Sequence, residues 1–183
     1  NIRYVPLFHA NEYSMEVHKD NEDIDLLYIV YGHSDRIRFL KDLILLSEAE
    51  GLVLKYYVYL DFYVFLKWII QRKLFISDIR FIRFIPLTLT EVICFYKKAK
   101  AIVDIHHSNQ DGITSRAIEA LGAGKLLLTT NKNISEYFQS DQVKVIDRDD
   151  IKIDKSWLSS NINRVNVRRT LKEWISEVFF FDQ

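Results

Sequence analysis

Two carboxylates that stand eight positions apart, Asp111 and Glu119, enclose the segment in which the residue types most clearly suggest chemistry. Between them lie one glycine, Gly112, and two hydroxyl side chains, Thr114 and Ser115, and apolar strand-like runs stand on both sides. In proteins built on a parallel sheet, this order brings the amino end of a helix to a ligand, where free amide groups and the helix dipole favour negative charge. The segment therefore predicts an anion site, and a nucleotide diphosphate fits it best.

A helix that begins after this loop would arrange the polar groups around the ligand. With Thr114 as its N-cap, the amides of Ser115 and Arg116 face the loop without intrahelical acceptors. Arg116 is a cation in the first turn, where it opposes the helix dipole, and this favours an anionic partner. Ile113 turns to the core, whereas Glu119 lies on the other side, where ribose hydroxyls can donate to it. The spacing fits equally well with a ligand-free cap and a solvated Glu119.

A second group of candidates follows the first expected strand. Gly32 and His33 form a turn, and Arg36 and Arg38 stand in the first part of the next helix. Ligands of doubly wound sheets bind beyond the carboxyl ends of the strands, so this turn is expected to face the same ligand. His33 would donate a hydrogen bond, and Arg36 or Arg38 would add positive charge. The alternative is that both arginines lie on a solvated helix face.

The alternation of short apolar runs with helical patterns predicts the elements that must position these residues. Continuous apolar strands are typical of a parallel sheet with helices on both faces, so we expect a Rossmann-like α/β fold of about six strands over residues 24–160. Residues 1–23 are expected to be an incoming connection, and 161–183 a long helix packed on the domain, with a peripheral membrane helix as the alternative. Strands are expected at 26–31, 55–60, 79–85, 101–105, 125–130 and 142–147, and helices at 34–50, 61–72, 88–100, 114–123 and 131–138.

Composition argues against two classes of function. The 183 residues carry 25 basic and 25 acidic side chains, so there is no basic field of the kind that binds nucleic acid. The apolar stretch 52–70 is interrupted by Lys55, Asp61 and Lys67, which a membrane span would have to bury at high cost. A strand followed by an amphipathic helix is the better interpretation of that stretch.

The remaining chemical groups suggest no other catalytic site. His106 and His107 are adjacent, and on an extended segment they point to opposite faces, which disfavours a shared metal ion. The chain has no HExxH, CxxC, Gly-x-Ser-x-Gly or Walker-type motif. Cys94 stands in an apolar helix pattern and is expected to be buried and inert.

The order of these motifs resembles the carboxy-terminal domain of retaining GT-B glycosyltransferases. Glu91–Ala99 looks like the glutamate helix of that family, Asp111–Thr114 stands where it has Glu-Gly-Phe-Gly, and Glu119–Gly124 stands where it has Glu-Ala-Met-Ala-x-Gly. The resemblance runs from about residue 26 to 131. Asp104–His107 and Lys125–Asn131 look more narrowly like bacterial enzymes of surface-polysaccharide or lipopolysaccharide assembly.

This resemblance implies a donor-binding half of a two-domain transferase, with a nucleoside diphosphate-sugar as substrate and a saccharide or lipid-linked saccharide as acceptor. It implies a preceding amino-terminal domain that carries the acceptor site, a cytoplasmic location at the inner face of the membrane, and no permanent cofactor, metal or nucleic acid. Asp111 would act on the donor sugar and Glu119 on the ribose. A sugar-nucleotide epimerase and a non-catalytic binding module are the alternatives. The other implied donor-binding residues are Gly112, Ile113, Thr114, Ser115, Arg116, Gly32, His33 and Arg36.

Overall fold

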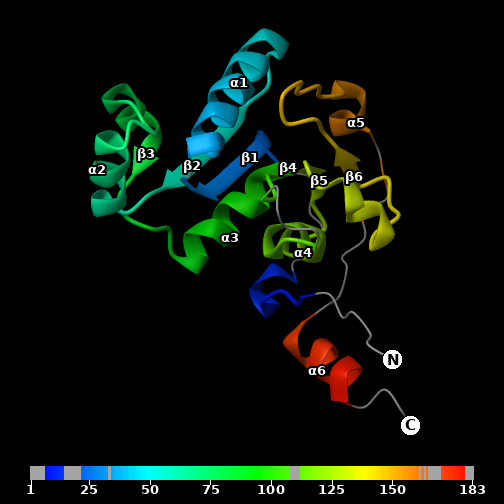
Figure 1. The fold of residues 1–183 in the computed structure, drawn as a ribbon. Helices are drawn as coiled ribbons and strands as arrows, with labels where there is room; N and C mark the ends of the chain where they lie inside the picture. The colour runs from blue at the N-terminus through cyan, green and yellow to red at the C-terminus, as the bar shows by residue number, and fades with distance from the viewer. Residues whose placement is uncertain are drawn as a thin grey trace.

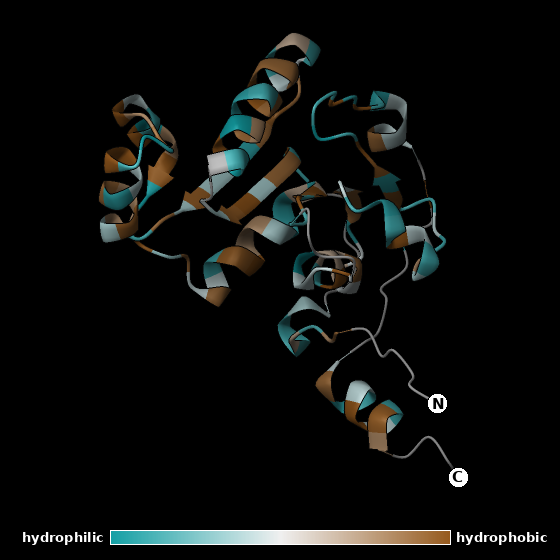
Figure 2. Ribbon diagram, viewed as in Figure 1, coloured by the Kyte–Doolittle hydropathy of each residue, from teal (hydrophilic) through white to brown (hydrophobic). Residues whose placement is uncertain are grey.

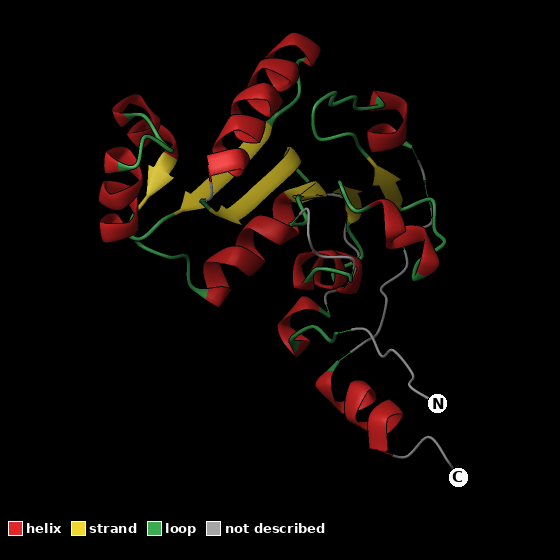
Figure 3. Cartoon of the chain, in the orientation of Figure 1, coloured by secondary structure: helices red, strands yellow, loops and turns green. Residues whose placement is uncertain are grey.

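Parallel strands form the centre of the molecule in the computed structural model, which describes residues 7–14, 22–32, 34–107, 112–160, 162, 164 and 170–179. The described strands form one six-stranded sheet in the order β3-β2-β1-β4-β5-β6, and every neighbouring pair is parallel (Figures 1 and 3). This confirms the expected Rossmann-like α/β fold. The strands are β1 (Ile24–Tyr31), β2 (Leu54–Tyr59), β3 (Ile82–Arg83), β4 (Ala99–Asp104), β5 (Leu126–Thr129) and β6 (Val143–Val145).

Helices cover both faces of this sheet because successive strand residues point to opposite sides. Leu26 and Tyr28 of β1 belong to a core shared with one helical layer, and Leu27 and Ile29 belong to a core shared with the other. The first layer contains α1 (Ser34–Glu50), α2 (Phe62–Ile70), the 3-10 helix η2 (Ile76–Phe81) and α5 (Lys155–Ser159). The second contains α3 (Leu89–Lys98), α4 (Ser115–Gly122) and the 3-10 helices η1 (Asn11–Tyr13) and η3 (Lys132–Glu136).

The connections leave β1 and β4 in opposite directions. From β1 the chain moves outward through β2 to β3, then returns through α3 to β4 on the other side of β1 and moves outward through β5 to β6. The carboxyl ends of β1 and β4 therefore form the switch point at which doubly wound folds bind their ligands. Local signals start the flanking helices: Asp61 caps α2, and Thr88 forms a capping box with Glu91 at α3.

The expectation of a strand over 79–85 is largely wrong. Residues 76–81 form η2 instead, and only Ile82 and Arg83 pair with β2. The cause is Asp78, which accepts a hydrogen bond from the Phe75 amide at 3.0 Å and pairs with Lys41 of α1 at 2.6 Å. These contacts hold residues 76–81 in tight turns, so pairing with β2 begins only at Ile82. Burial of the Asp78 side chain, which is 4% exposed, makes this pairing necessary.

Three further differences concern helices. The last described helix, α6 (Leu171–Phe179), is shorter than expected, since Ile162 and Arg164 lie outside helices. At its start the Glu173 carboxylate accepts a hydrogen bond from the Thr170 amide at 2.7 Å. It contacts the segment 7–14, with the rings of Phe8 and Trp174 5.5 Å apart, and residues 161, 163, 165–169 and 180–183 lie outside the described residues. The short helix α5 was not expected. Cys94 is exposed on α3, which contradicts the expected buried thiol.

Neither α6 nor any other helix of the described segments combines the length and the apolar character that crossing a membrane requires.

Candidate functional site

A cavity of about 270 Å³ opens at the switch point between β1 and β4. Its walls come from elements far apart in the sequence: the ends of β1 and β4, the first turns of α1 and α4, and the segment 7–14. The residues that line it are Leu7, Ile29, Val30, Arg36, Val103, Asp104, Ile105, Thr114, Ser115 and Arg116. The fold thus brings together four of the residues that the sequence pointed to, namely Arg36, Thr114, Ser115 and Arg116.

The amino end of α4 meets the cavity as its sequence predicts. Thr114 has extended backbone angles and caps the helix, with its hydroxyl accepting a hydrogen bond from the Ala117 amide at 3.1 Å. Among the described residues, no acceptor meets the amides of Ser115 or Arg116. Two donors and the positive end of the helix dipole therefore face this space.

Two arginines flank these amides. Arg36 extends from α1 toward the carboxyl end of β4, where its Nη2 donates a hydrogen bond to the Ile105 carbonyl at 3.2 Å. Arg116 lies 3.7 Å from the Glu119 carboxylate, with its side chain 27% exposed. Arg38, the other candidate on α1, is exposed and pairs with Asp149 at 3.3 Å, so it takes no part in the cavity wall.

Among the polar residues that line the cavity, Asp104 is the one that the sequence analysis did not assign to the site. It is the last residue of β4, is 4% exposed, and accepts hydrogen bonds from the Thr129 hydroxyl at 2.9 Å and from the Thr114 hydroxyl. Burial raises the pKa of Asp104, while these hydrogen bonds and the nearby Arg116 act in the opposite direction. The sequence feature that could have identified Asp104 is its position, because this carboxylate ends an apolar strand beside the switch point.

Glu119 has partners of its own in the structure. Its carboxylate pairs with Arg116 and takes part in a hydrogen bond with the Tyr13 hydroxyl, and burial raises its pKa. The ring of His9 lies over Gly122, where an added Cβ would stand 2.5 Å from it. The segment 7–14 therefore covers the face of α4 to which a ribose was assigned. The ribose contact of Glu119 stays a prediction.

Three further predicted residues, Gly32, Gly112 and Ile113, are absent from the cavity lining. An added Cβ on Gly32 would lie 2.9 Å from Val58 Cγ1, so this glycine permits close strand packing rather than ligand approach. Ile113 is 2% exposed in the core, and the Gly112 carbonyl accepts a hydrogen bond from Asn131 at 3.1 Å. His33 and Asp111 lie outside the described residues.

His106, two residues after the end of β4, is held by its neighbours. The backbone amide and the ring Nδ1 of His106 lie 3.2 and 2.8 Å from the Thr130 hydroxyl, and Arg148 donates a hydrogen bond to the His106 carbonyl. Arg148 also pairs with Asp35 at 3.0 Å, so it links the loop to α1. Within the described ranges, no group of three or more histidine, cysteine or carboxylate residues could hold a metal ion.

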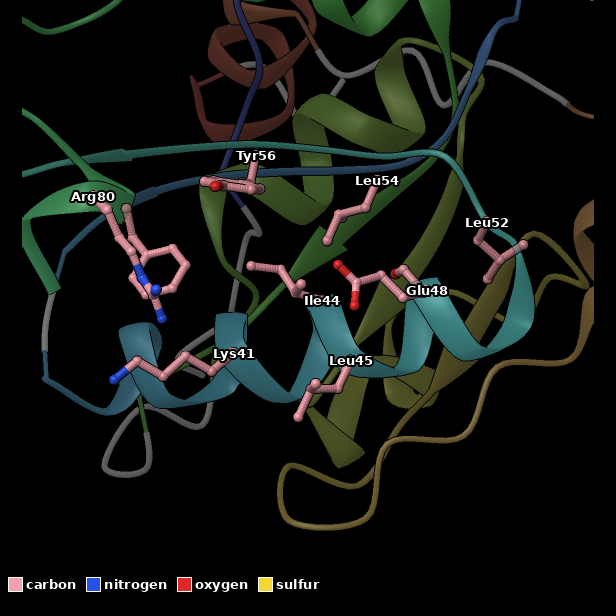
Figure 4. Close-up of a pocket in the computed structure, with 10 residues that line it drawn as sticks. Lys41, Ile44, Leu45, Glu48, Leu52, Leu54, Tyr56 and Arg80 are labelled. Carbon is pink, nitrogen blue, oxygen red and sulfur yellow. The ribbon is translucent and has the colours of Figure 1, made fainter. Parts of the chain in front are cut away.

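A larger cavity, of about 700 Å³, lies between α1, β2 and η2 (Figure 4). Its floor is apolar, with Ile44 and Leu54 beside the carboxylate of Glu48, and Lys41 and Arg80 lie at one end. Lys41 already pairs with Asp78, and Arg80 stacks on Phe81 with 4.6 Å to the ring centroid. This cavity lacks free helix amides, and it is the weaker candidate for an anion site.

Fold and site together define a doubly wound α/β protein with a polar cavity at its switch point. Comparison of the sequence with models of known protein families and with curated proteins finds no match. The chemistry of the cavity is therefore the basis for assigning a function.

Proposed function

We propose that the switch-point cavity binds the diphosphate of a nucleoside diphosphate-sugar, and that this chain is the donor-binding half of a glycosyltransferase. One observation carries the proposal: among the described residues the amides of Ser115 and Arg116 meet no acceptor, and both residues line one cavity together with Arg36. Backbone amides at the start of a helix, together with arginine side chains, commonly bind phosphate groups in proteins. Synthesis of a bacterial surface polysaccharide or lipopolysaccharide, at the inner face of the membrane, is the setting that the sequence resemblance suggests.

The charges around the cavity are compatible with this ligand. Arg36 and Arg116 bring two positive charges, and Asp104 brings one negative charge when it is ionised. A diphosphate would approach that carboxylate, but the raised pKa of Asp104 eases its protonation. Glu119 offsets part of the charge of Arg116, so the attraction would come mainly from Arg36 and the α4 amides. In sugar transfer, the bond between the sugar and the diphosphate breaks, and negative charge grows on the leaving group. The α4 amides and the arginines would stabilise that charge.

The size of the cavity limits what it holds. About 270 Å³ lies just below the range of roughly 300–1,000 Å³ for pockets that enclose a whole small molecule. We therefore place the diphosphate inside and the base and sugar outside. The ribose hydroxyls would reach Glu119 by replacing the hydroxyl of Tyr13. The sugar would lie toward the loop that contains Asp111, whose assigned catalytic role remains part of the proposal.

Calorimetric titration with UDP, GDP, ADP and inorganic pyrophosphate tests the binding site. Arg36→Ala should weaken binding by about 1.5–3 kcal/mol, the value of a hydrogen bond to a charged group. Arg38→Ala is the matched control, because Arg38 lies on the same helix and pairs with Asp149 away from the cavity. Equal affinities of both variants and the wild type would refute the site.

A second titration isolates the ribose contact. Glu119→Gln should weaken UDP binding but leave pyrophosphate binding unchanged, because only the nucleotide carries a ribose. Tyr13→Phe should strengthen UDP binding, since it removes the hydroxyl that competes for Glu119. If Glu119→Gln weakens both ligands equally, Glu119 only orients Arg116.

The reaction itself is tested by incubating the protein with a panel of nucleotide sugars and saccharide acceptors. Transfer to an acceptor supports a glycosyltransferase. An epimerised sugar nucleotide would support an epimerase on the same fold, and binding without turnover would support a non-catalytic module.

A further inference from the structure

The helix α2 is apolar on two faces, although only one of them is covered. Phe65 is buried, and Trp68 and Ile69 pack against the core. On the outer side, Tyr63 is 79% exposed and Ile70 is 82% exposed. A helix that is hydrophobic all round is normally buried in protein or in lipid, so we expect the outer face of α2 to contact another molecule.

The exposed apolar surface continues past α2 into η2 and β3. Phe75, which precedes η2, and Ile76, its first residue, are 72% and 73% exposed. Figure 2 shows hydrophobic colour over much of α2, η2 and β3, at the β3 edge of the sheet. The exposed apolar residues Phe62, Tyr63, Leu66, Ile70, Phe75, Ile76, Ile79 and Ile85 are called the α2–η2 surface below.

Positive charge accompanies this surface. The segment 61–85 carries five exposed cations and two acids, whereas the whole chain has 25 of each sign. Both acids are occupied inside the protein, since Asp61 caps α2 and the buried Asp78 pairs with Lys41. The surface therefore presents apolar side chains among cations, which are Lys67, Arg72, Lys73, Arg80 and Arg83.

One of these cations stands where the backbone favours glycine. Arg72 has a φ of +55°, and the next amide, that of Lys73, closes the end of α2 by donating to the Trp68 carbonyl at 2.9 Å. In this left-handed conformation a side chain adds strain that glycine avoids. Replacing Arg72 by glycine should therefore remove its positive charge without destabilising the fold.

We propose that the α2–η2 surface binds the surface of an anionic lipid bilayer. Apolar side chains would enter the boundary between headgroups and acyl chains, and the cations would meet the negative headgroups. Charge complementarity selects this occupant over a second copy of the chain, because a two-fold contact through this surface would bring its cations together. The proposal does not depend on the nucleotide site, which lies at the carboxyl ends of β1 and β4.

The test is co-sedimentation of the whole chain with vesicles of phosphatidylcholine alone, and with vesicles of phosphatidylcholine and phosphatidylglycerol in equal parts. We expect binding to the anionic vesicles that weakens as salt is added. The double variant Phe75→Glu/Ile76→Glu should lose about tenfold or more of this binding, because charged side chains resist burial at the interface. Val145→Glu is the control, since Val145 is exposed on β6, at the opposite edge of the sheet.

Arg72→Gly gives an independent reading that does not depend on the double variant being folded. It should raise the melting temperature and lower binding to anionic vesicles severalfold. Equal binding to both vesicle types would overturn the proposal, as would full binding by the glutamate variant. A wild-type dimer in sedimentation velocity that the glutamate variant converts to monomer would also overturn it, by assigning the surface to a protein contact.

Discussion

Two clusters of buried charge lie at opposite ends of the same sheet. At the amino ends of the strands, the Glu22 carboxylate accepts hydrogen bonds from Lys125 at 2.8 Å and from Arg164 at 2.6 and 2.9 Å, and all three side chains are 3–4% exposed. At the carboxyl ends, Asp104 lies beside Arg36 and Arg116, with a cavity of about 270 Å³ among them. The first cluster is closed by its own members, and the second leaves room for another molecule.

The difference shows what distinguishes a stabilising cluster from a candidate binding site. Burial shifts pKa values in both places, lowering that of Lys125 and raising that of Asp104, so a shifted pKa alone does not separate them. What separates them is the cavity and the amides of Ser115 and Arg116, which meet no acceptor in the described part of the chain. The closed cluster joins Arg164 to the region before β1 and β5, and its role is to hold the chain together.

The largest effect is expected from opening the closed cluster. Glu22→Ala leaves the cations of Lys125 and Arg164 buried without their carboxylate, and should cost about 3–5 kcal/mol of stability in urea unfolding. The control is Glu50→Ala, which breaks an exposed pair with Lys155 and should cost about 0–1 kcal/mol. Similar losses in the two variants would mean that the buried cluster does not stabilise the fold as described.

Removing one amide from the open site should affect binding without affecting stability. Ser115→Pro deletes the first helix donor, and proline is well tolerated at this position because the preceding Thr114 is extended. Pyrophosphate affinity should fall by about 1–3 kcal/mol, measured by calorimetry. Lys155→Pro makes the same change at the start of α5 and should leave affinity intact. A loss in both variants would point to a general effect of proline.

The charge of Asp104 should work against the ligand. Asp104→Asn removes a negative charge from the cavity wall and should tighten pyrophosphate binding by about 1–2 kcal/mol near neutral pH. Because burial raises the pKa of Asp104, the folded protein holds this proton more tightly than the unfolded chain. Its contribution to stability is therefore greatest at low pH and falls as pH rises through the folded pKa.

The same titration gives the pH dependence of binding. The advantage of the Asn variant over the wild type should shrink as pH falls and Asp104 takes up its proton, and comparing the two proteins cancels the titration of the phosphate. A constant difference over the acid-to-neutral range would show that Asp104 does not titrate there.

The smallest effect is expected where the segment 7–14 covers α4. Gly122→Ala would place a Cβ within 2.5 Å of the His9 ring, which must move aside. The expected cost is about 1 kcal/mol, the low end for overpacking, because the atoms that the new Cβ meets belong to a side-chain ring and not to backbone. Hydrogen exchange at residues 9–13 should quicken while that of β4 and β5 stays the same. Unchanged exchange at residues 9–13 would show that the segment does not rest on Gly122.

Features set by local sequence could be predicted. The apolar runs of β1, β4 and β5 located the centre of the sheet, and the cap at Thr114 placed the start of α4 correctly. Both follow from the alternation of strand residues and from hydrogen bonds within a few positions.

Features that depend on contacts between residues far apart in the sequence could not be predicted. The pairing of Asp78 with Lys41 turned an expected strand into η2, and Tyr13 approached Glu119 from more than a hundred positions away. Cys94 is next to residues on the packed face of α3. An apolar pattern does not show which of two neighbouring residues points to the core. Asp104 became a candidate only when the order of the strands showed which loops meet.

The amide resonances of Ser115 and Arg116 report whether the start of α4 holds a diphosphate. We expect added pyrophosphate to shift these two signals downfield in a saturable way, together with the guanidinium signal of Arg36, while the amide signals around Glu22 and Lys125 stay in place. Saturable shifts confined to other residues, or none at all, would contradict the diphosphate site.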